Sequence, residues 1–147
     1  IPKIIINCIR RKKIPIYGKG ENIREWIYVE DHCNALFKIY KNGKLGRTYN
    51  IGSGKNFNNL KIAKNLIKIA KKHINIGKKT KITLVKDRPG HDLRYALNSN
   101  KIIKELNWKY KVDLDEGLKK TFLWYLKNQN YFKKFNKSDI INRLGHD

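Results

Sequence analysis

The stretch IPIYGKGENIREWIYVEDHCNAL, residues 14–36, contains two extended segments followed by a helix. Pro15 to Tyr17 is predicted to form a short strand that stops at two nearby glycines. Glu25 to Val29 alternates large aromatic residues with others, which predicts a second strand. The acidic residues 30–31 then begin a helix, where the helix macrodipole favours negative charge. Short strands followed by a helix indicate a mixed α/β architecture.

The same alternation extends to both sides of this stretch. Apolar residues recur at helical spacing in four further segments, residues 4–9, 60–70, 98–106 and 114–128. Three more short strands are predicted, at residues 48–51, 81–85 and 94–97. Such strands are too short and too few for a complete doubly wound sheet. We therefore predict a small mixed α/β lobe that packs against a part not present here.

The chain has 147 residues, which fits one domain or one lobe of a larger enzyme. It begins with Ile1 and contains no methionine, so we expect the first residue to lie inside a longer reading frame. No secretory signal and no run of 18 apolar residues is present. We therefore predict no membrane association.

The net charge of +22 suggests a nucleic acid or another anionic partner. The excess is mostly lysine, with only seven arginines, although arginine is the residue favoured for bidentate phosphate and base contacts. Lysine, isoleucine and asparagine dominate together, as expected if an AT-rich genome biases the codons. We interpret the charge mainly as such drift. A basic nucleic-acid-binding module remains the alternative from a different functional class, and it would gather lysines on one face.

The two cysteines, Cys8 and Cys33, both lie on apolar stripes of predicted helices. We expect both to be free, buried thiols that act as small apolar residues. Their number and spacing predict neither a disulfide framework nor a zinc site. Free thiols suit a cytoplasmic location.

The segment DRPGHD, residues 87–92, is the strongest candidate for chemistry. The fork of the Arg88 guanidinium matches phosphate oxygens, and His91 can add a second donor. Pro89 stiffens the loop, and Gly90 admits close approach of a ligand to the backbone. The alternative is a surface turn with an incidental ion pair, and the residues alone leave both open.

Residues at three further places could bind a ligand, but each also has an ordinary structural explanation. Arg24 can pair with Glu25 or Asp31, or reach an anion. Ile16 and Tyr17 can belong to the core, or hold a flat base by stacking and main-chain hydrogen bonds. Asn58 or Asn59 can cap the helix after it, and Asn59 can still offer its amide to a ligand.

Four motifs together resemble the dTDP-glucose 4,6-dehydratases, a family of extended short-chain dehydrogenases/reductases. The stretch at 14–36, GRTYNIGSG at 46–54, DRPGHDLRYAL at 87–97 and NWKYKVDLDEGLKKTFLWYLKN at 107–128 follow one another in the family's order. The resemblance implies a nucleotide-sugar-binding lobe at residues 1–130 and a carboxyl-terminal tail at 131–147. The first two motifs fit many sugar-nucleotide enzymes, and the DRPGHD block narrows the match to the dehydratases.

The family converts dTDP-glucose to dTDP-4-keto-6-deoxyglucose and water with a tightly held NAD. By motif position, the resemblance implies that Pro15, Ile16 and Tyr17 contact the base. It implies that ribose and diphosphate are held by Arg24, Asn59, Arg88 and His91, while Asp87, Pro89 and Gly90 shape that loop. The implied substrate-binding residues are Pro15, Ile16, Tyr17, Arg24, Asn59, Asp87, Arg88, Pro89, Gly90 and His91. It also implies a cytoplasmic enzyme that is a homodimer at full length.

The family's catalytic motifs are missing from this chain. No glycine-rich dinucleotide fingerprint occurs. Of the eight tyrosines, only Tyr40 has a lysine four residues later, Lys44, and this pair spans the predicted helix end at Gly43. Gly52-Ser53-Gly54-Lys55 lacks the spacing of a nucleoside triphosphate loop. We therefore assign no catalytic residue and expect NAD to be bound by an absent amino-terminal half. A related UDP-sugar epimerase or decarboxylase, or a degraded remnant of the gene, remains as an alternative.

Overall fold

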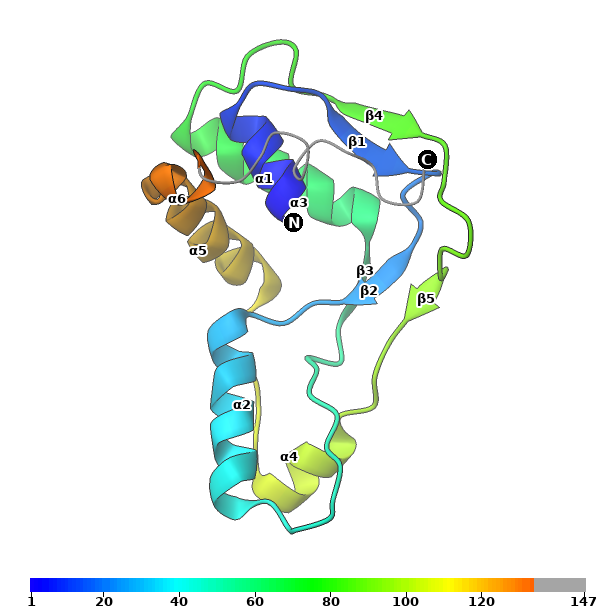
Figure 1. Cartoon of the computed structure of the whole chain (residues 1–147), viewed down its shortest axis with the longest axis vertical. Coiled ribbons are helices and arrows are strands. Elements are labelled where there is room, and N and C mark those ends of the chain that lie inside the picture. Colours follow the sequence, from blue (N-terminus) through cyan, green and yellow to red (C-terminus); the bar gives the residue numbers. More distant parts are fainter. Residues whose placement is uncertain (134–147) are drawn as a thin grey trace.

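Two short parallel strands lie beside three packed helices in the computed structural model, which describes residues 1–133 (Figure 1). Strand β1 (Ile14–Tyr17) pairs with β4 (Ile82–Val85), so that Ile14 aligns with Ile82 and Tyr17 with Val85. Ile14 and Ile16 are buried in the core beside the helices. Successive strand residues face opposite ways, so Pro15 and Tyr17 project from the other face.

The three helices form the larger of two apolar cores. They are α1 (Pro2–Ile9), α3 (Asn59–His73) and α5 (Leu114–Lys127). Ile5, Leu66 and Phe122 are fully buried between them. The lysines of α3 lie on its outer face, as the amphipathic pattern predicted. Burial of these side chains is the main force that holds this part together.

A second sheet connects the core to the rest of the chain. Strand β2 (Ile23–Glu25) pairs antiparallel with β3 (Asn56–Asn58) and parallel with β5 (Arg94–Tyr95). The predicted strand at 25–29 is wrong, because β2 ends at Glu25 and the next helix already begins at Val29. The aromatic side chains between them line a cavity and do not face a neighbouring strand.

The predicted strand at 48–51 is also wrong, since these residues have no strand partner. Side-chain hydrogen bonds hold this segment instead. The Tyr49 hydroxyl donates to the Glu105 carboxylate at 2.9 Å, and the Asn50 amide donates to the Asn98 carbonyl at 3.3 Å. The segment is extended because of these distant contacts and not through a backbone ladder.

The smaller core lies between α2 (Val29–Asn42) and α4 (Asn100–Leu106). It buries Ala35, Ile102, Leu106 and Trp108. The buried Asp31 carboxylate accepts hydrogen bonds from the backbone N–H groups of residues 111 and 112, at 3.0 and 2.9 Å. This carboxylate therefore joins the start of α2 to the segment that leads into α5.

Helix α6 (Gln129–Lys133) continues the chain after α5. The tail predicted at 131–147 therefore begins in a helix, and its residues 134–147 lie outside the described part.

Residues 1–133 form a small α/β lobe with short parallel and mixed sheets, as the sequence predicted. Within residues 1–133, no helix has the length and apolar character needed to cross a membrane.

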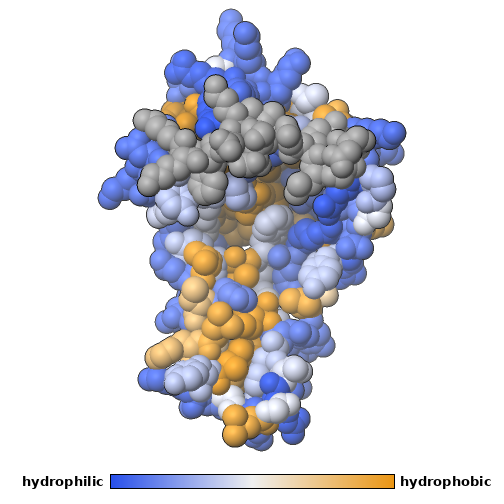
Figure 2. All heavy atoms as spheres, viewed as in Figure 1, coloured by the Kyte–Doolittle hydropathy of each residue, from blue (hydrophilic) through white to orange (hydrophobic). Residues whose placement is uncertain are grey.

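Helix α2 presents several apolar side chains to solvent. Leu36, Phe37 and Tyr40 are 50, 57 and 85% exposed. Figure 2 shows apolar residues gathered over the lower part of the molecule, where α2 and α4 lie. Cys33 is on this helix and is exposed, so the prediction of a buried thiol is wrong for it. The prediction is confirmed for Cys8, which is fully buried in the larger core.

Candidate substrate-binding site

The loop DRPGHD at residues 87–92 follows strand β4 and is fixed by its own first residue. Asp87 Oδ1 accepts a hydrogen bond from the backbone N–H of Arg88 at 2.9 Å. The same oxygen lies 2.7 Å from His91 Nδ1. The hydrogen bond from His91 lowers the pKa of the Asp87 carboxyl, and the Arg88 N–H lowers it further. A carboxylate that orients an imidazole leaves the opposite ring nitrogen, Nε2, for a ligand.

The loop packs closely on the turn that follows β1. Gly18 has φ +53°, and a Cβ added there would lie 2.9 Å from Asp87 Oδ2. Its backbone N–H donates to the carbonyl of Val85 at 2.8 Å. Glycine is thus required for both its conformation and its size. This contact brings the ends of β1 and β4 together at the candidate site.

The three candidate base-contacting residues of β1 differ in what they offer. Tyr17 is half-buried, and its ring meets the His91 ring edge-on, with centroids 6.0 Å apart. Pro15 lies on the same face of the strand. The Ile16 side chain is 6% exposed and belongs to the core, so only its backbone could contact a ligand. The surface suited to a flat base is therefore formed by Pro15 and Tyr17.

Arg24 reaches the same loop from β2. Its Nη2 donates to the carbonyl of Asp92 at 2.9 Å, and its Nη1 donates to that of Ile23 at 2.7 Å. The alternative of an ion pair with Glu25 or Asp31 is not realised within residues 1–133; both carboxylates accept backbone N–H groups instead. The guanidinium has five N–H donors, so donors remain for an anion after these two bonds.

Asn59 begins α3, but it is not the helix cap. Asn58 is the cap, and its Oδ1 accepts from the Lys61 N–H at 2.8 Å. The Asn59 N–H donates to the carbonyl of Asn22 at 3.1 Å. The alternative in which Asn59 caps the helix is therefore excluded. Its side-chain amide is not needed for that task, and its backbone lies beside the β1–β2 turn.

Asn22, which no sequence motif singles out, connects the start of α3 to the candidate loop. It is 5% exposed, and its amide donates to the carbonyl of Asp92 at 3.3 Å. It therefore links the start of α3, through Asn59, to the loop that Arg24 also holds. A polar residue between a glycine and an arginine gives no signal of such a role, because its partners lie far away in the sequence.

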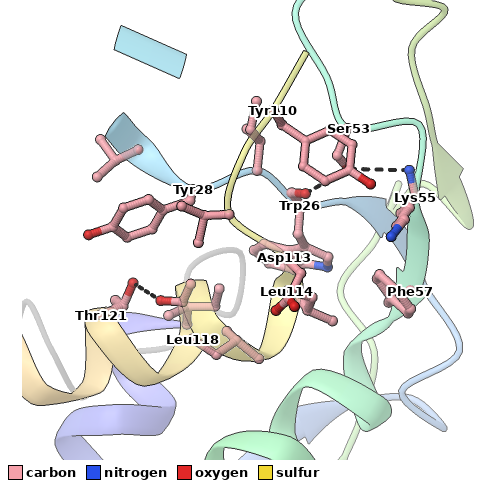
Figure 3. Close-up of a pocket in the computed structure, with 15 residues that line it drawn as sticks. Trp26, Tyr28, Ser53, Lys55, Phe57, Tyr110, Asp113, Leu114, Leu118 and Thr121 are labelled. Carbon is pink, nitrogen blue, oxygen red and sulfur yellow. Dashed lines mark hydrogen bonds between the residues drawn. The ribbon is translucent and has the colours of Figure 1, made fainter. Parts of the chain in front are cut away.

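A separate cavity of about 190 Å³ lies between α5 and the segment that joins β2 to α2 (Figure 3). Its walls are mainly aromatic and aliphatic, and none of the ten candidate substrate-binding residues lines it. The Trp26 indole N–H has no hydrogen-bond partner within the described residues. The Asp113 carboxylate, also in its wall, accepts the Glu116 N–H and caps α5. The cavity is therefore a mainly apolar pocket whose Asp113 carboxylate is already engaged at the start of α5.

The loop Gly52-Ser53-Gly54 does not form a phosphate site. The backbone N–H of Gly54 donates to the carboxylate of Glu25, and a Cβ at Gly52 would collide with that carboxylate. A negative group already fills the position that a phosphate would need. The described strands also form no doubly wound sheet. Residues 1–133 thus do not fit a dinucleotide cofactor, and they contain no cluster that could hold a metal ion.

The sequence matches the family model for GDP-mannose 4,6 dehydratase over residues 1–121. The chain belongs to this family. Relatives about 40% identical to this chain are named dTDP-glucose 4,6-dehydratase. The enzyme of Shigella flexneri is 43% identical over 133 residues, which cover 89% of this chain and 37% of that protein.

Solved structures of two dTDP-glucose 4,6-dehydratases superimpose on this chain. The dTDP-glucose 4,6-dehydratase of Bacillus anthracis, in complex with NAD, superimposes with a TM-score of 0.80 at 37% identity over 90% of this chain and 40% of that one. The enzyme of Streptomyces venezuelae, with NAD and TYD bound, gives a TM-score of 0.80 at 33% identity, over 89 and 39%. This family member thus spans less than half the length of those relatives.

Proposed function

We propose that the chain is the substrate-binding part of an NAD-dependent dTDP-glucose 4,6-dehydratase. The observation that carries this proposal is that Tyr17 and Arg24 both contact the loop at 87–92. The loop itself contains His91, held by Asp87, and the exposed Arg88. Two guanidinium groups suit a diphosphate, since each can form paired charge-assisted hydrogen bonds. The named activities of the relatives support dTDP-glucose as the substrate.

In this proposal the chain's own residues bind and orient the substrate. Tyr17 and Pro15 face the base, while Arg24, Arg88, His91 and Asn59 hold ribose and diphosphate. Asp87 keeps the His91 ring in one orientation. Pro89 restricts the loop, and Gly90, at φ +63°, turns it. NAD supplies the hydride transfer when it is bound by sequence outside this chain.

The proposal assigns no catalytic residue to the chain, so the isolated polypeptide should not turn over. Dehydratase activity from the 147-residue chain would contradict this. The same proposal includes a homodimer at full length, which is taken from the resemblance. It also includes a cytoplasmic location, which the two free cysteines support.

Calorimetry with dTDP on the 147-residue chain tests the substrate site. We expect Arg88→Ala to weaken dTDP binding by roughly tenfold or more, since a charge-assisted hydrogen bond contributes about 1.5–3 kcal/mol. Arg47→Ala is the matched control, because Arg47 is an equally exposed arginine on the loop after α2. Equal effects of the two substitutions, or no binding by the parent chain, would contradict the proposal. Tighter binding of UDP than of dTDP would favour a UDP-sugar enzyme.

A further inference from the structure

A hollow of about 840 Å³ lies between α1, the loop after it, and the residues that lead into β4. We call it the basic groove. Among residues 1–133, eleven line it; seven of these are positively charged and none is negatively charged. The charged residues are Lys3, Arg11, Lys12, Lys13, Lys78, Lys79 and Lys81. Segments that lie far apart in the sequence thus bring their lysines to one place.

The backbone under these charges is held in position. Arg11 Nε donates to the carbonyl of Asn75 at 3.1 Å, and the Ile14 N–H donates to that of Lys81 at 2.9 Å. The Asn7 amide donates to the carbonyl of Lys13 at 2.9 Å. The two sides of the groove are therefore joined before any ligand arrives. Like charges gathered in a hollow create a positive potential that attracts anions.

The lining also limits which anion fits. Within the described part of the chain, no aromatic side chain lines the groove, so these residues offer no platform on which bases could stack. The backbone groups named above are already paired, which leaves few partners for an added peptide strand. Recognition therefore depends on flexible ammonium groups, which bind phosphate as point charges. A single phosphate could neutralise only a fraction of seven charges.

We propose that the basic groove binds a chain of three or more linked phosphates. The site is distinct from the proposed nucleotide-sugar site. Lys12, Lys13 and Lys81 precede the amino-terminal ends of β1 and β4, whereas Tyr17 and Asp87 lie at their carboxyl-terminal ends. Pro15 belongs to both sets of residues, and Val85 of the groove pairs with Tyr17, so the two sites are set apart by the position of the charged residues.

The competing explanation is that a chain of net charge +22 attracts polyanions everywhere. Two triple variants with equal loss of charge separate the explanations. One replaces Lys78, Lys79 and Lys81 of the groove by glutamine. The other replaces Lys64, Lys71 and Lys104, which are exposed on α3 and α4 and do not line the groove. Thermal melting of both variants shows that the fold is retained.

The probe is tripolyphosphate, titrated by calorimetry at about 50 mM and 200 mM salt, a range over which phosphate contacts weaken strongly. We expect the groove variant to bind roughly tenfold or more weakly than the parent, and the control variant to change by less than about twofold. Equal losses in both variants would show that binding follows net charge and would overturn the proposal. Absence of tripolyphosphate binding by the parent would overturn it as well.

A single-stranded oligonucleotide of about a dozen residues identifies the source of the phosphates. If the oligonucleotide binds more tightly than tripolyphosphate and the groove variant loses this binding, the site is assigned to a nucleic-acid backbone. Binding of tripolyphosphate alone assigns it to free oligophosphate. The groove variant should keep the dTDP affinity of the parent, and a parallel loss would overturn the claim of a separate site. If only dTDP fails to bind, the proposed function fails and the groove proposal stands.

Discussion

Asp87 and His91 form the contact that shapes the candidate loop, and their coupling can be measured. The His91 hydrogen bond holds the pKa of the Asp87 carboxyl below its ordinary value of 3.8. We expect His91→Ala to raise that pKa towards 3.8, as followed by carbon NMR of the carboxyl group. Because the folded-state pKa is depressed, the stabilisation is present above the unfolded pKa and is lost as pH falls through the folded pKa.

Lys86, beside Asp87 in the sequence, provides the control for that experiment. Lys86→Gln removes a neighbouring charge but leaves the hydrogen bond from His91 in place. It should shift the Asp87 pKa much less than His91→Ala does. An unchanged Asp87 pKa in the His91 variant would show that the imidazole does not form a hydrogen bond with this carboxylate.

The two cysteines should differ strongly in reactivity. Cys8 is fully buried, and burial raises the pKa of its thiol to about 11, whereas Cys33 is exposed. Since the thiolate is the nucleophile, we expect an aromatic disulfide reagent at about pH 8 to label Cys33 quickly. Cys8 should react only after denaturant is added. Cys33→Ser should abolish the fast phase, and Cys8→Ser should leave it; the opposite pattern would contradict the burial of Cys8.

At the scale of elements, two adjacent asparagines at the start of α3 have different roles, one in stability and one in proposed binding. Asn58 caps the helix, while the Asn59 side chain is proposed to contact substrate. We expect Asn58→Ala to cost about 1 kcal/mol of unfolding free energy, measured by urea denaturation, with dTDP binding retained. Asn59→Ala should weaken dTDP binding and leave stability nearly unchanged. Equal stability losses would show that the two side chains share the capping role.

The sequence predicted helices better than strands, and the reason is physical. An amphipathic pattern repeats along α3 and α5, so packing and local preference agree. Trp26 and Tyr28 resemble strand residues, yet they line the cavity of Figure 3. Their partners come from α5 and from residues near 55 and 110, and a local pattern carries no information about such distant contacts.

The candidate site was predictable only in part, for the same reason. The residue types of the loop at 87–92 suit an anion site, but by themselves they suit a surface turn with an incidental ion pair equally well. The contacts that position it come from Gly18, Asn22 and Arg24, each more than 60 positions away in the sequence. The gathering of lysines in the basic groove is likewise visible only after folding. Lysines that are scattered along the chain can still converge in space.

At the scale of the whole molecule, the two apolar cores should differ in stability. The larger core buries Phe122, Ile5 and Leu66 completely, whereas the smaller core has four buried residues and leaves much of α2 exposed. Local opening is easiest where few apolar contacts are buried. We therefore expect amides of α2 and α4 to exchange hydrogen faster than those of α3, as measured by mass spectrometry under native conditions.

Two substitutions of equally buried aliphatic residues sharpen this expectation. Ile102→Ala removes side-chain volume from the smaller core and Leu66→Ala from the larger one, and both residues are 0% exposed. Each change should cost about 2–5 kcal/mol locally. Ile102→Ala should accelerate exchange in α2 and α4 while α3 keeps its protection, because α3 does not depend on that core. Leu66→Ala should lower protection in α1, α3 and α5. If Ile102→Ala lowered protection equally in every helix, the lobe would unfold as one cooperative unit and the two cores would not be independent.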